Sequence, residues 1–198
     1  MGILKKIRKI LLLPFRIMGY GEFGVHSDIV NPFLVSGRSH IFIGDRTIIR
    51  DYARIEAIDS YWFLDNDIAS EKRQTQVFNP RLTIGNHVTI EQGVHITCSN
   101  NLTISDNVTI SSYVYISDTS HSYSRIGLSV LDQPLNNSPV YIGECAFIGT
   151  GVKILPGVSI GAHSVIGANS VVTHSIPADC VAVGVPAVVI KRLDGEKQ

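Results

Sequence analysis

The feature that most constrains this chain is an apolar residue that recurs at every sixth position. The repeat opens in a similar way at four places, Ile41–Gly44, Leu82–Gly85, Leu102–Ser105 and Val140–Gly143. Steps of six from these motifs reach fifteen apolar positions, of which fourteen are Ile and the last is Val: 43, 49, 55, 84, 90, 96, 104, 110, 116, 142, 148, 154, 160, 166 and 172. A period of six fits neither the 3.6-residue turn of a helix nor one long alternating strand, but it fits a short strand followed by a bend.

A second set of residues, small or β-branched, lies four positions after these apolar residues and is also predicted to point inward. Its members are Thr47, Ala53, Val88, Val94, Val108, Val114, Ala146, Val152, Val158, Ser164 and Ser170. Glycine often follows the apolar residue directly, and we expect it to supply the unusual backbone angles of the bend. These glycines are Gly44, Gly85, Gly143, Gly149, Gly161 and Gly167.

The repeats predict an all-β fold, a parallel β-helix of hexapeptide repeats in which three short strands close each coil. One domain over residues 25–177 accounts for them, and its coils are expected at 43–60, 84–101, 104–121, 142–159 and 160–177, after a degenerate coil at 25–42. Two segments, 61–81 and 119–139, do not follow the six-residue repeat and are expected to form loops that project from the coils. Loops on a rigid scaffold often carry binding and catalysis. Residues 178–198 are expected to form a C-terminal tail.

Residues 1–24 are predicted to form a basic amphipathic segment with a short helix. Its cations, interleaved with Ile and Leu, are Lys5, Lys6, Arg8, Lys9 and Arg16. The apolar stretch is too short to span a bilayer, and Pro14 interrupts it before a signal peptide could develop. Two interpretations stay open: residues 3–17 lie on an anionic membrane surface, or they pack on the body of the same or a neighbouring subunit.

The composition excludes some classes of partner and setting. Lys plus Arg and Asp plus Glu number 17 each, so no global field attracts nucleic acid, and no nucleic-acid partner is expected. The cysteines Cys98, Cys145 and Cys180 stand far apart and form no CxxC pair, which disfavours a disulfide framework or a zinc knuckle. A cytoplasmic location is therefore predicted, at the inner face of the membrane if the N-terminal segment binds lipid.

The stretch from Tyr141 to Thr173, followed by Ile176-Pro177 and Val183–Ile190, resembles the hexapeptide-repeat, left-handed β-helix acyltransferases. The similarity covers about residues 82–192 and is strongest to the branch of maltose, galactoside and polysaccharide O-acetyltransferases. It implies a left-handed coil, a homotrimer with active sites between subunits, and transfer of an acetyl group from acetyl-CoA to a sugar hydroxyl. Polysaccharide or lipopolysaccharide biosynthesis is the expected setting, and no metal is expected.

The resemblance also implies site residues on the acceptor side. His121, in Ile116-Ser-Asp-Thr-Ser-His121-Ser-Tyr123, stands where the family carries its catalytic base. Asp118 either orients that imidazole or caps the turn, and Tyr123 is expected to contact the acceptor. His95 occupies a place where many relatives carry Asn, which helps to hold the acceptor or the base.

For the donor, the resemblance assigns a groove between subunits to residues of the last coils. Four of them would line the pantetheine arm: Phe147, Thr150, Ala168 and Thr173. Backbone N–H groups near Thr150 would also stabilise the tetrahedral oxyanion. Lys191 and Arg192 follow the closing motif and would meet the phosphates of coenzyme A.

Three alternatives stay beside this interpretation. In the first, the acceptor is a nucleotide-linked amino sugar and the chain is an N-acetyltransferase. In the second, the chain is a non-catalytic β-solenoid. In the third, the chain is a zinc enzyme like the metal-dependent carbonic anhydrases, which resemble it in their repeat. That family holds zinc with three histidines, two of them spaced H-x4-H, and this spacing does not occur in the sequence. The remaining histidines are expected to be solvated: His26, His40, His87, His163 and His174.

Overall fold

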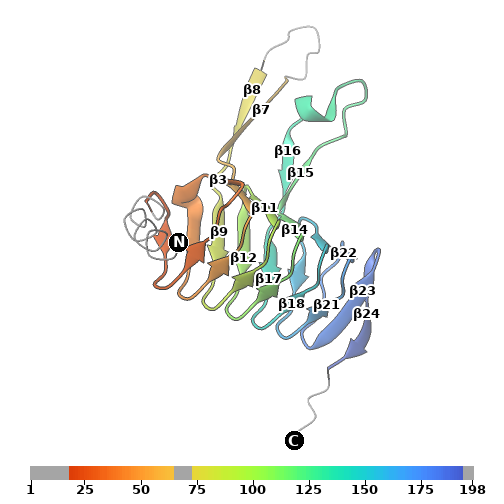
Figure 1. Ribbon diagram of the computed structural model, residues 1–198. Helices are drawn as coiled ribbons and strands as arrows, with labels where there is room; N and C mark the ends of the chain where they lie inside the picture. Colours follow the sequence, from red (N-terminus) through yellow and green to blue (C-terminus); the bar gives the residue numbers. More distant parts are fainter. Residues whose placement is uncertain (1–17, 65–72, 194–198) are drawn as a thin grey trace, which may run out of the picture.

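The computed structural model describes residues 18–64 and 73–193, and within them three parallel sheets form the faces of a prism (Figure 1). Sheet A contains β1 (Glu22–Phe23), β4 (Ile41–Ile43), β9 (Arg81–Ile84), β12 (Asn101–Ile104), β17 (Val140–Ile142) and β20 (Ser159–Ile160). Sheet B contains β2 (Asp28–Ile29), β5 (Ile48–Ile49), β10 (Thr89–Ile90), β13 (Thr109–Ile110), β18 (Phe147–Ile148), β21 (Val165–Ile166), β23 (Cys180–Gly184) and β24 (Ala187–Arg192). Sheet C contains β3 (Leu34–Ser36), β6 (Arg54–Ala57), β11 (His95–Cys98), β14 (Tyr115–Ser117), β19 (Lys153–Ile154) and β22 (Val171–Val172).

Each coil gives one strand to each sheet, so the predicted parallel β-helix is confirmed. The inner isoleucines stack in register along sheet A, where Ile84 pairs with Ile43 on one side and Ile104 on the other, and Ile142 pairs with Ile104 and Ile160. All fifteen residues of the six-residue period are at most 1% exposed. The second predicted inward set is buried as well. The core is therefore a column of aliphatic side chains inside the coils.

The glycines that follow the inner residues do not work as expected. Gly44, Gly85, Gly143, Gly149, Gly161 and Gly167 lie outside the positive-φ region, which is occupied instead two residues further on, for example at His87 (φ 54°) and His163 (φ 57°). A Cβ on Gly143 would lie 2.5 Å from the backbone nitrogen of Ala162 in the next coil. Glycine is required at these positions because successive coils approach too closely for a side chain, and the expectation of unusual backbone angles there was wrong.

The ends of the prism extend beyond the expected boundaries. β1 already pairs with β4, through Glu22 and Phe42. At the other end, the segment expected to be a tail contains β23, which adds to β21 in parallel, and β24, which turns back antiparallel to β23. Cys180 and Ala182 on β23 are fully buried, so this strand covers the end of the core. Most of the predicted N-terminal segment, residues 1–17, lies outside the described residues.

Both segments that leave the period contain antiparallel hairpins. β7 (Ser60–Leu64) pairs with β8 (Arg73–Val77), and β15 (Thr119–His121) pairs with β16 (Leu135–Asn137). A 3-10 turn, η3 (Val130–Asp132), lies in the second excursion, and another, η1 (Arg38–His40), precedes β4. Each hairpin starts after a strand of sheet C, and the two project side by side from the same edge of the prism (Figure 1). Among the residues described, no helix is long and apolar enough to cross a membrane.

Candidate active site

A cleft of about 610 Å³ lies on the outer face of sheet C, below the two hairpins. It brings together three of the residues predicted from the sequence, His95, His121 and Thr173. The other residues that line it come from sheet C, its exit turns and the hairpins: Arg54, Glu56, Ile58, Tyr61, Thr97, Tyr115, Ser117, Thr119, Ser120, Leu135, Leu155 and Pro156.

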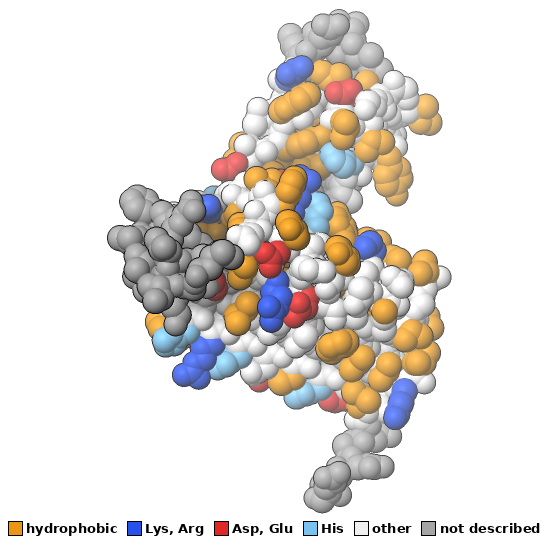
Figure 2. All heavy atoms as spheres, in the orientation of Figure 1, with side chains coloured by type: hydrophobic (Ala, Val, Ile, Leu, Met, Phe, Trp, Pro, Cys, Tyr) orange, Lys and Arg blue, Asp and Glu red, His pale blue; other side chains and the backbone are white. Residues whose placement is uncertain are grey.

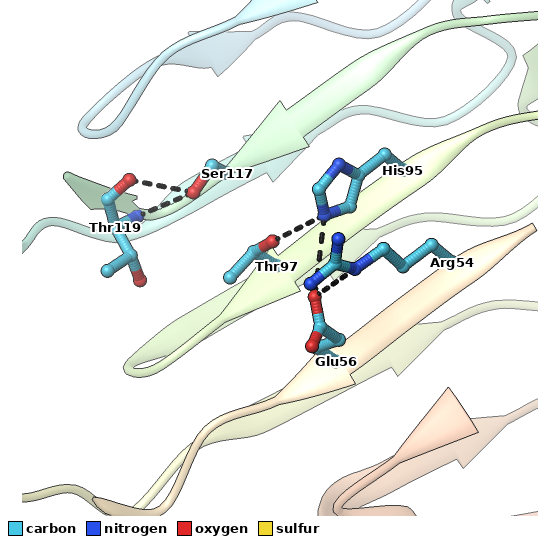
Figure 3. Close-up of polar contacts among 6 residues, drawn as sticks. All are labelled: Arg54, Glu56, His95, Thr97, Ser117 and Thr119. Atoms are coloured by element: carbon cyan, nitrogen blue, oxygen red, sulfur yellow. Dashed lines mark hydrogen bonds and ion pairs between the residues drawn. The ribbon is translucent and has the colours of Figure 1, made fainter. Parts of the chain in front are cut away.

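The floor of the cleft is an ordered array of side chains, which we call the sheet C array. Residues on either side of an inner Ile point outward, so the parallel register aligns them in two rows. One row is Arg54, His95 and Tyr115, and the other is Glu56, Thr97 and Ser117. Figure 3 shows five of the six together with Thr119, the first residue of β15. The hexapeptide repeat thereby places donors and acceptors at regular intervals on a rigid surface.

Within the array, His95 is held by two neighbours. Its Nε2 lies 3.1 Å from Thr97 Oγ1 and 3.5 Å from Glu56 Oε2, while Arg54 Nε donates to that same carboxylate oxygen (Figure 3). The Tyr115 ring meets the imidazole edge-on at 5.2 Å between centroids. Burial lowers the pKa of His95 below its ordinary 6.5, the positive charge of Arg54 lowers it further, and Glu56 partly opposes both. His95 is therefore a neutral hydrogen-bonding group at neutral pH.

His121 is the last residue of β15 and reaches the cleft from above the floor. Across the hairpin it pairs with Leu135, which is 5% exposed. The Tyr61 ring of the other hairpin meets the imidazole edge-on at 5.7 Å between centroids. Its Nδ1 is buried and has no hydrogen-bond partner within residues 18–64 and 73–193. Ring packing, rather than a hydrogen bond at Nδ1, therefore orients this imidazole in the single chain.

Asp118 lies beneath the cleft, fully buried at the start of the second hairpin. Its carboxylate accepts hydrogen bonds from the backbone N–H of Ser99 at 2.8 Å and of Asn100 at 2.9 Å. It also accepts one from Thr119 Oγ1 at 2.6 Å. These partners tie the base of the hairpin to the turn of the preceding coil. The sequence left two roles open for Asp118, orienting the imidazole or capping the turn, and these hydrogen bonds are those of a turn cap.

The predicted donor residues occupy other parts of the prism, apart from Thr173. Phe147 projects from sheet B and is 43% exposed. Its register continues through Val165 and Val181 to Lys191, so one outward row joins the aromatic ring to the basic residue. Thr150 and Ala168 are exposed at the turns that follow β18 and β21, and Arg192 is exposed at the end of β24.

Tyr123 stands apart from the cleft lining. It lies in the loop beyond β15 and is 83% exposed. The described residues hold no group of three or more His, Cys, Asp and Glu side chains that could bind a metal ion. His87, at an exposed turn between sheets A and B, lies in a different part of the coil from His95 on sheet C.

Apart from His95, the members of the sheet C array were missed by the sequence analysis, and so was Tyr61. The sheet C array could have been found from the repeat, because each member flanks an inner Ile, as Arg54 and Glu56 flank Ile55. Tyr61 lies in an aperiodic segment, and its approach to His121 depends on how two hairpins pack. No sequence pattern marks that contact.

Comparison with known proteins extends this picture. The family described as bacterial transferase hexapeptide (six repeats) matches residues 139–174. The putative lipopolysaccharide biosynthesis O-acetyl transferase WbbJ of Escherichia coli K12 is 36% identical over 160 residues, which are 81% of this chain and 64% of that protein. A galactoside O-acetyltransferase of Lactococcus lactis is 50% identical over 58 residues, 29% of this chain and 28% of its own length. The chain thus spans less than two thirds of each of these relatives.

Solved structures share the architecture. A maltose O-acetyltransferase from Clostridium difficile 630 aligns with a TM-score of 0.52 and 26% identity, covering 89% of this chain and 71% of that one. AntD, an N-acyltransferase from Bacillus cereus solved with dTDP and 3-hydroxybutyryl-CoA, aligns with a TM-score of 0.65 and 18% identity, covering 96% and 87%. The second likeness shows the fold alone. Together these findings confirm the resemblance seen in the sequence: the chain carries the repeats of the bacterial hexapeptide transferases on an all-β, left-handed parallel β-helix.

Proposed function

We propose that this chain is an acyl-CoA-dependent O-acetyltransferase that moves an acetyl group from acetyl-CoA to a hydroxyl of a sugar. The observation that carries the proposal is the cleft in which His121 faces the sheet C array. An imidazole beside an array of hydroxyl, carboxylate and guanidinium groups suits proton abstraction from a bound polyol. Relatives named as O-acetyltransferases support the same assignment.

In the proposed reaction, His121 is the general base. It takes the proton of the acceptor hydroxyl while that oxygen attacks the thioester carbonyl. The C–O bond forms, the tetrahedral intermediate collapses with loss of the C–S bond, and His121 returns the proton to the departing thiolate. Backbone N–H groups near Thr150 of a neighbouring subunit would stabilise the oxyanion. Asp118 contributes by fixing the turn from which β15 starts, through its bonds to Ser99 and Asn100.

The sheet C array is the proposed acceptor surface. Glu56 and the neutral His95 offer acceptors for sugar hydroxyls, and Thr97 adds a hydroxyl group. The Ser117 hydroxyl is engaged by the backbone of Thr119, donating to its carbonyl at 2.8 Å and accepting from its N–H at 3.0 Å, so it holds the start of β15 instead (Figure 3). The Tyr115 ring supplies an apolar face of the kind that packs against a sugar ring. Tyr123, on the exposed loop of the same hairpin, is proposed to contact the part of the acceptor that extends out of the cleft.

The donor is proposed to bind between subunits of a homotrimer. Phe147 and Lys191 share an outward row on sheet B, and Thr150 and Ala168 lie at nearby turns, whereas His121 belongs to the cleft on sheet C. One acetyl-CoA molecule would contact the residues of sheet B and also reach His121 most simply if sheet B of one subunit faced the cleft of another. Hydrophobic side chains also gather over the C-terminal end of the prism (Figure 2), where those at least 40% exposed are Phe147, Val185, Val188, Val189 and Ile190.

Sedimentation tests the assembly independently of chemistry. The trimer mass is expected at micromolar concentration. A purely monomeric species that still turned over acetyl-CoA would contradict a site built between subunits.

Release of free thiol from acetyl-CoA, measured with a panel of acceptors, tests the activity. Neutral sugars and glycans are expected to give an ester product that mild base removes. An amide product formed only with nucleotide-linked amino sugars would replace the proposal by the N-acetyltransferase alternative. No thiol release with either class would leave a non-catalytic solenoid as the better description.

The acceptor is proposed to belong to cell-surface polysaccharide or lipopolysaccharide, with the reaction on the cytoplasmic side. Contact of residues 3–17 with the membrane stays a prediction, because those residues lie outside the described part of the chain. Mass spectrometry of surface glycans from cells with and without the protein would identify the acceptor as the glycan that loses its acetyl groups. Unchanged acetylation of every surface glycan would contradict this setting.

A further inference from the structure

The hairpin that carries His121 is too small to fix the imidazole by itself. Its strands β15 and β16 have three residues each, and an isolated two-stranded hairpin is at best marginally stable in water. Asp118 ties its base to the preceding coil, but His121 lies three residues further along. Additional contacts must therefore hold the imidazole where it meets a substrate.

Those contacts come from the β7–β8 hairpin. The Gln76 side chain forms two hydrogen bonds with the backbone of Leu135: Nε2 donates to the carbonyl oxygen at 2.9 Å, and Oε1 accepts from the N–H at 2.9 Å. A primary amide thus pairs with a peptide unit as a neighbouring strand would. Leu135 is the residue that pairs with His121 across the second hairpin.

The partner of Gln76 across β7–β8 completes the arrangement. It is Tyr61, whose ring meets the His121 imidazole edge-on and whose hydroxyl donates to the carbonyl of Leu131. Tyr61–Gln76 and His121–Leu135 are therefore two cross-strand pairs that face each other, joined on one side by ring packing and on the other by a double hydrogen bond. A further bond, from Arg125 Nη1 to the carbonyl of Leu64 at 3.1 Å, joins the hairpins nearer their tips.

From this geometry we propose that the β7–β8 hairpin is part of the catalytic apparatus, with Gln76 and Tyr61 as positioning residues that hold His121 in its working place. The inference rests on the proposed function. The His121 Nδ1 has no protein partner in the described residues, so the ring depends on Tyr61 and on the position of the hairpin for its orientation. Displacement of a reacting group by about 1 Å can cost on the order of 100-fold in rate.

Amide hydrogen exchange tests the docking without reference to activity. In Gln76→Ala, the Leu135 N–H loses its acceptor, and exchange over residues 119–137 is expected to rise at least about tenfold, while the coils stay protected. Gln76→Glu keeps the volume and an acceptor for the Leu135 N–H, but it places a carboxylate oxygen against the Leu135 carbonyl oxygen in place of a donor. This repulsion is expected to undock the hairpin, so exchange should rise here as well. Thr75→Ala, an exposed position on the same strand, is the matched control and should leave exchange unchanged.

Kinetics on the same variants test the positioning. Gln76→Ala, Gln76→Glu and Tyr61→Ala are expected to lower kcat by roughly 10- to 100-fold with little change in the KM of acetyl-CoA. Tyr61→Phe keeps the ring and should retain most of the activity. Raised exchange with wild-type kcat, or wild-type exchange in Gln76→Ala, would overturn the proposal. So would equal losses in Tyr61→Phe and Tyr61→Ala, because the ring contact would then not matter.

The proposed function can fail separately. A wild-type protein that transfers acetyl to no acceptor would contradict that function. In that event, ring NMR signals of His121, identified by their loss in His121→Ala, would still decide the inference. They are expected to shift in Gln76→Ala and Tyr61→Ala but not in Thr75→Ala, and unchanged signals in all three variants would overturn it.

Discussion

The prism and the pair of hairpins are built in opposite ways. In the prism, each inner residue pairs with its equivalent in the next coil, as Ile104 does with Ile84 and Ile142, so one local rule fixes the whole body. The hairpins share no repeat, and their mutual position depends on individual contacts such as Gln76 to Leu135. The candidate site lies where the two meet. The prism supplies a rigid floor, and the hairpins supply the proposed base.

The sharpest test of this division is removal of the proposed base. His121→Ala is expected to lower turnover by roughly 10²–10⁴-fold, the usual loss for a general base. Acetyl-CoA affinity, measured by calorimetry, should change little, since the proposed donor groove is built from the last coils and the C-terminal hairpin. His163→Asn, at an exposed turn with φ 57°, is the matched control because Asn tolerates that backbone region. Transfer near the wild-type rate in His121→Ala would remove this residue from the mechanism and make His95 the next candidate.

Mutations inside the prism are expected to change the free energy of unfolding rather than the rate of acetyl transfer. Ile104→Ala leaves a cavity in the fully buried column and is expected to lower the free energy of unfolding by about 2–5 kcal/mol. Thr103→Ala, the outward neighbour, should cost less than about 1 kcal/mol. Urea unfolding of both variants measures the difference. Equal effects at the two positions would contradict the inward and outward assignment.

The proposed donor row can be tested through the phosphates of coenzyme A. Lys191→Ala combined with Arg192→Ala is expected to raise the KM of acetyl-CoA by about tenfold, the size of one or two lost charge-assisted hydrogen bonds. The KM of a donor without the 3′-phosphate should rise less. Steady-state kinetics with both donors makes the comparison. Equal increases would mean that this pair does not recognise that phosphate.

The smallest expected effect concerns the floor of the cleft. Burial, reinforced by Arg54, lowers the pKa of His95, so below pH 6.5 the unfolded chain binds a proton at this residue more readily than the folded one. This difference in proton binding does not change the free energy of unfolding above pH 6.5. It lowers that free energy progressively as the pH falls from 6.5 towards the pKa of His95 in the folded chain. His95→Gln should therefore lose less stability than the wild type as the pH falls below 6.5. Identical pH profiles of Tm for the wild type and His95→Gln would show that His95 does not contribute to the pH dependence of stability.

The repeat made most of the fold predictable because it is local. An inward residue every six positions is enough to set strand, bend and register. The fifteen residues of the six-residue period and the second inward set were all found buried, whereas Val35 of the degenerate first coil is only partly buried. The glycine prediction failed because it considered a single bend. Gly143 cannot be replaced by a larger residue because Ala162 of the next coil lies too close. A single hexapeptide does not contain this neighbour. The end of the prism was misplaced for a related reason, since Cys180 and Ala182 close the core without following the six-residue step.

By itself, the sequence determined the coils, the two excursions and, through the family resemblance, the prediction of His121 as the base. Only the tertiary structure decided that Asp118 bonds to the preceding coil, that the sheet C array lines the cleft, and that Tyr61 and Gln76 meet the hairpin of His121. The physical reason is the range of the contacts. Periodic burial can be recognised in any segment of the chain, whereas the side chains of Gln76 and Tyr61 reach residues about 60 positions away, at Leu135 and His121, and those pairings exist only once both hairpins have folded against each other.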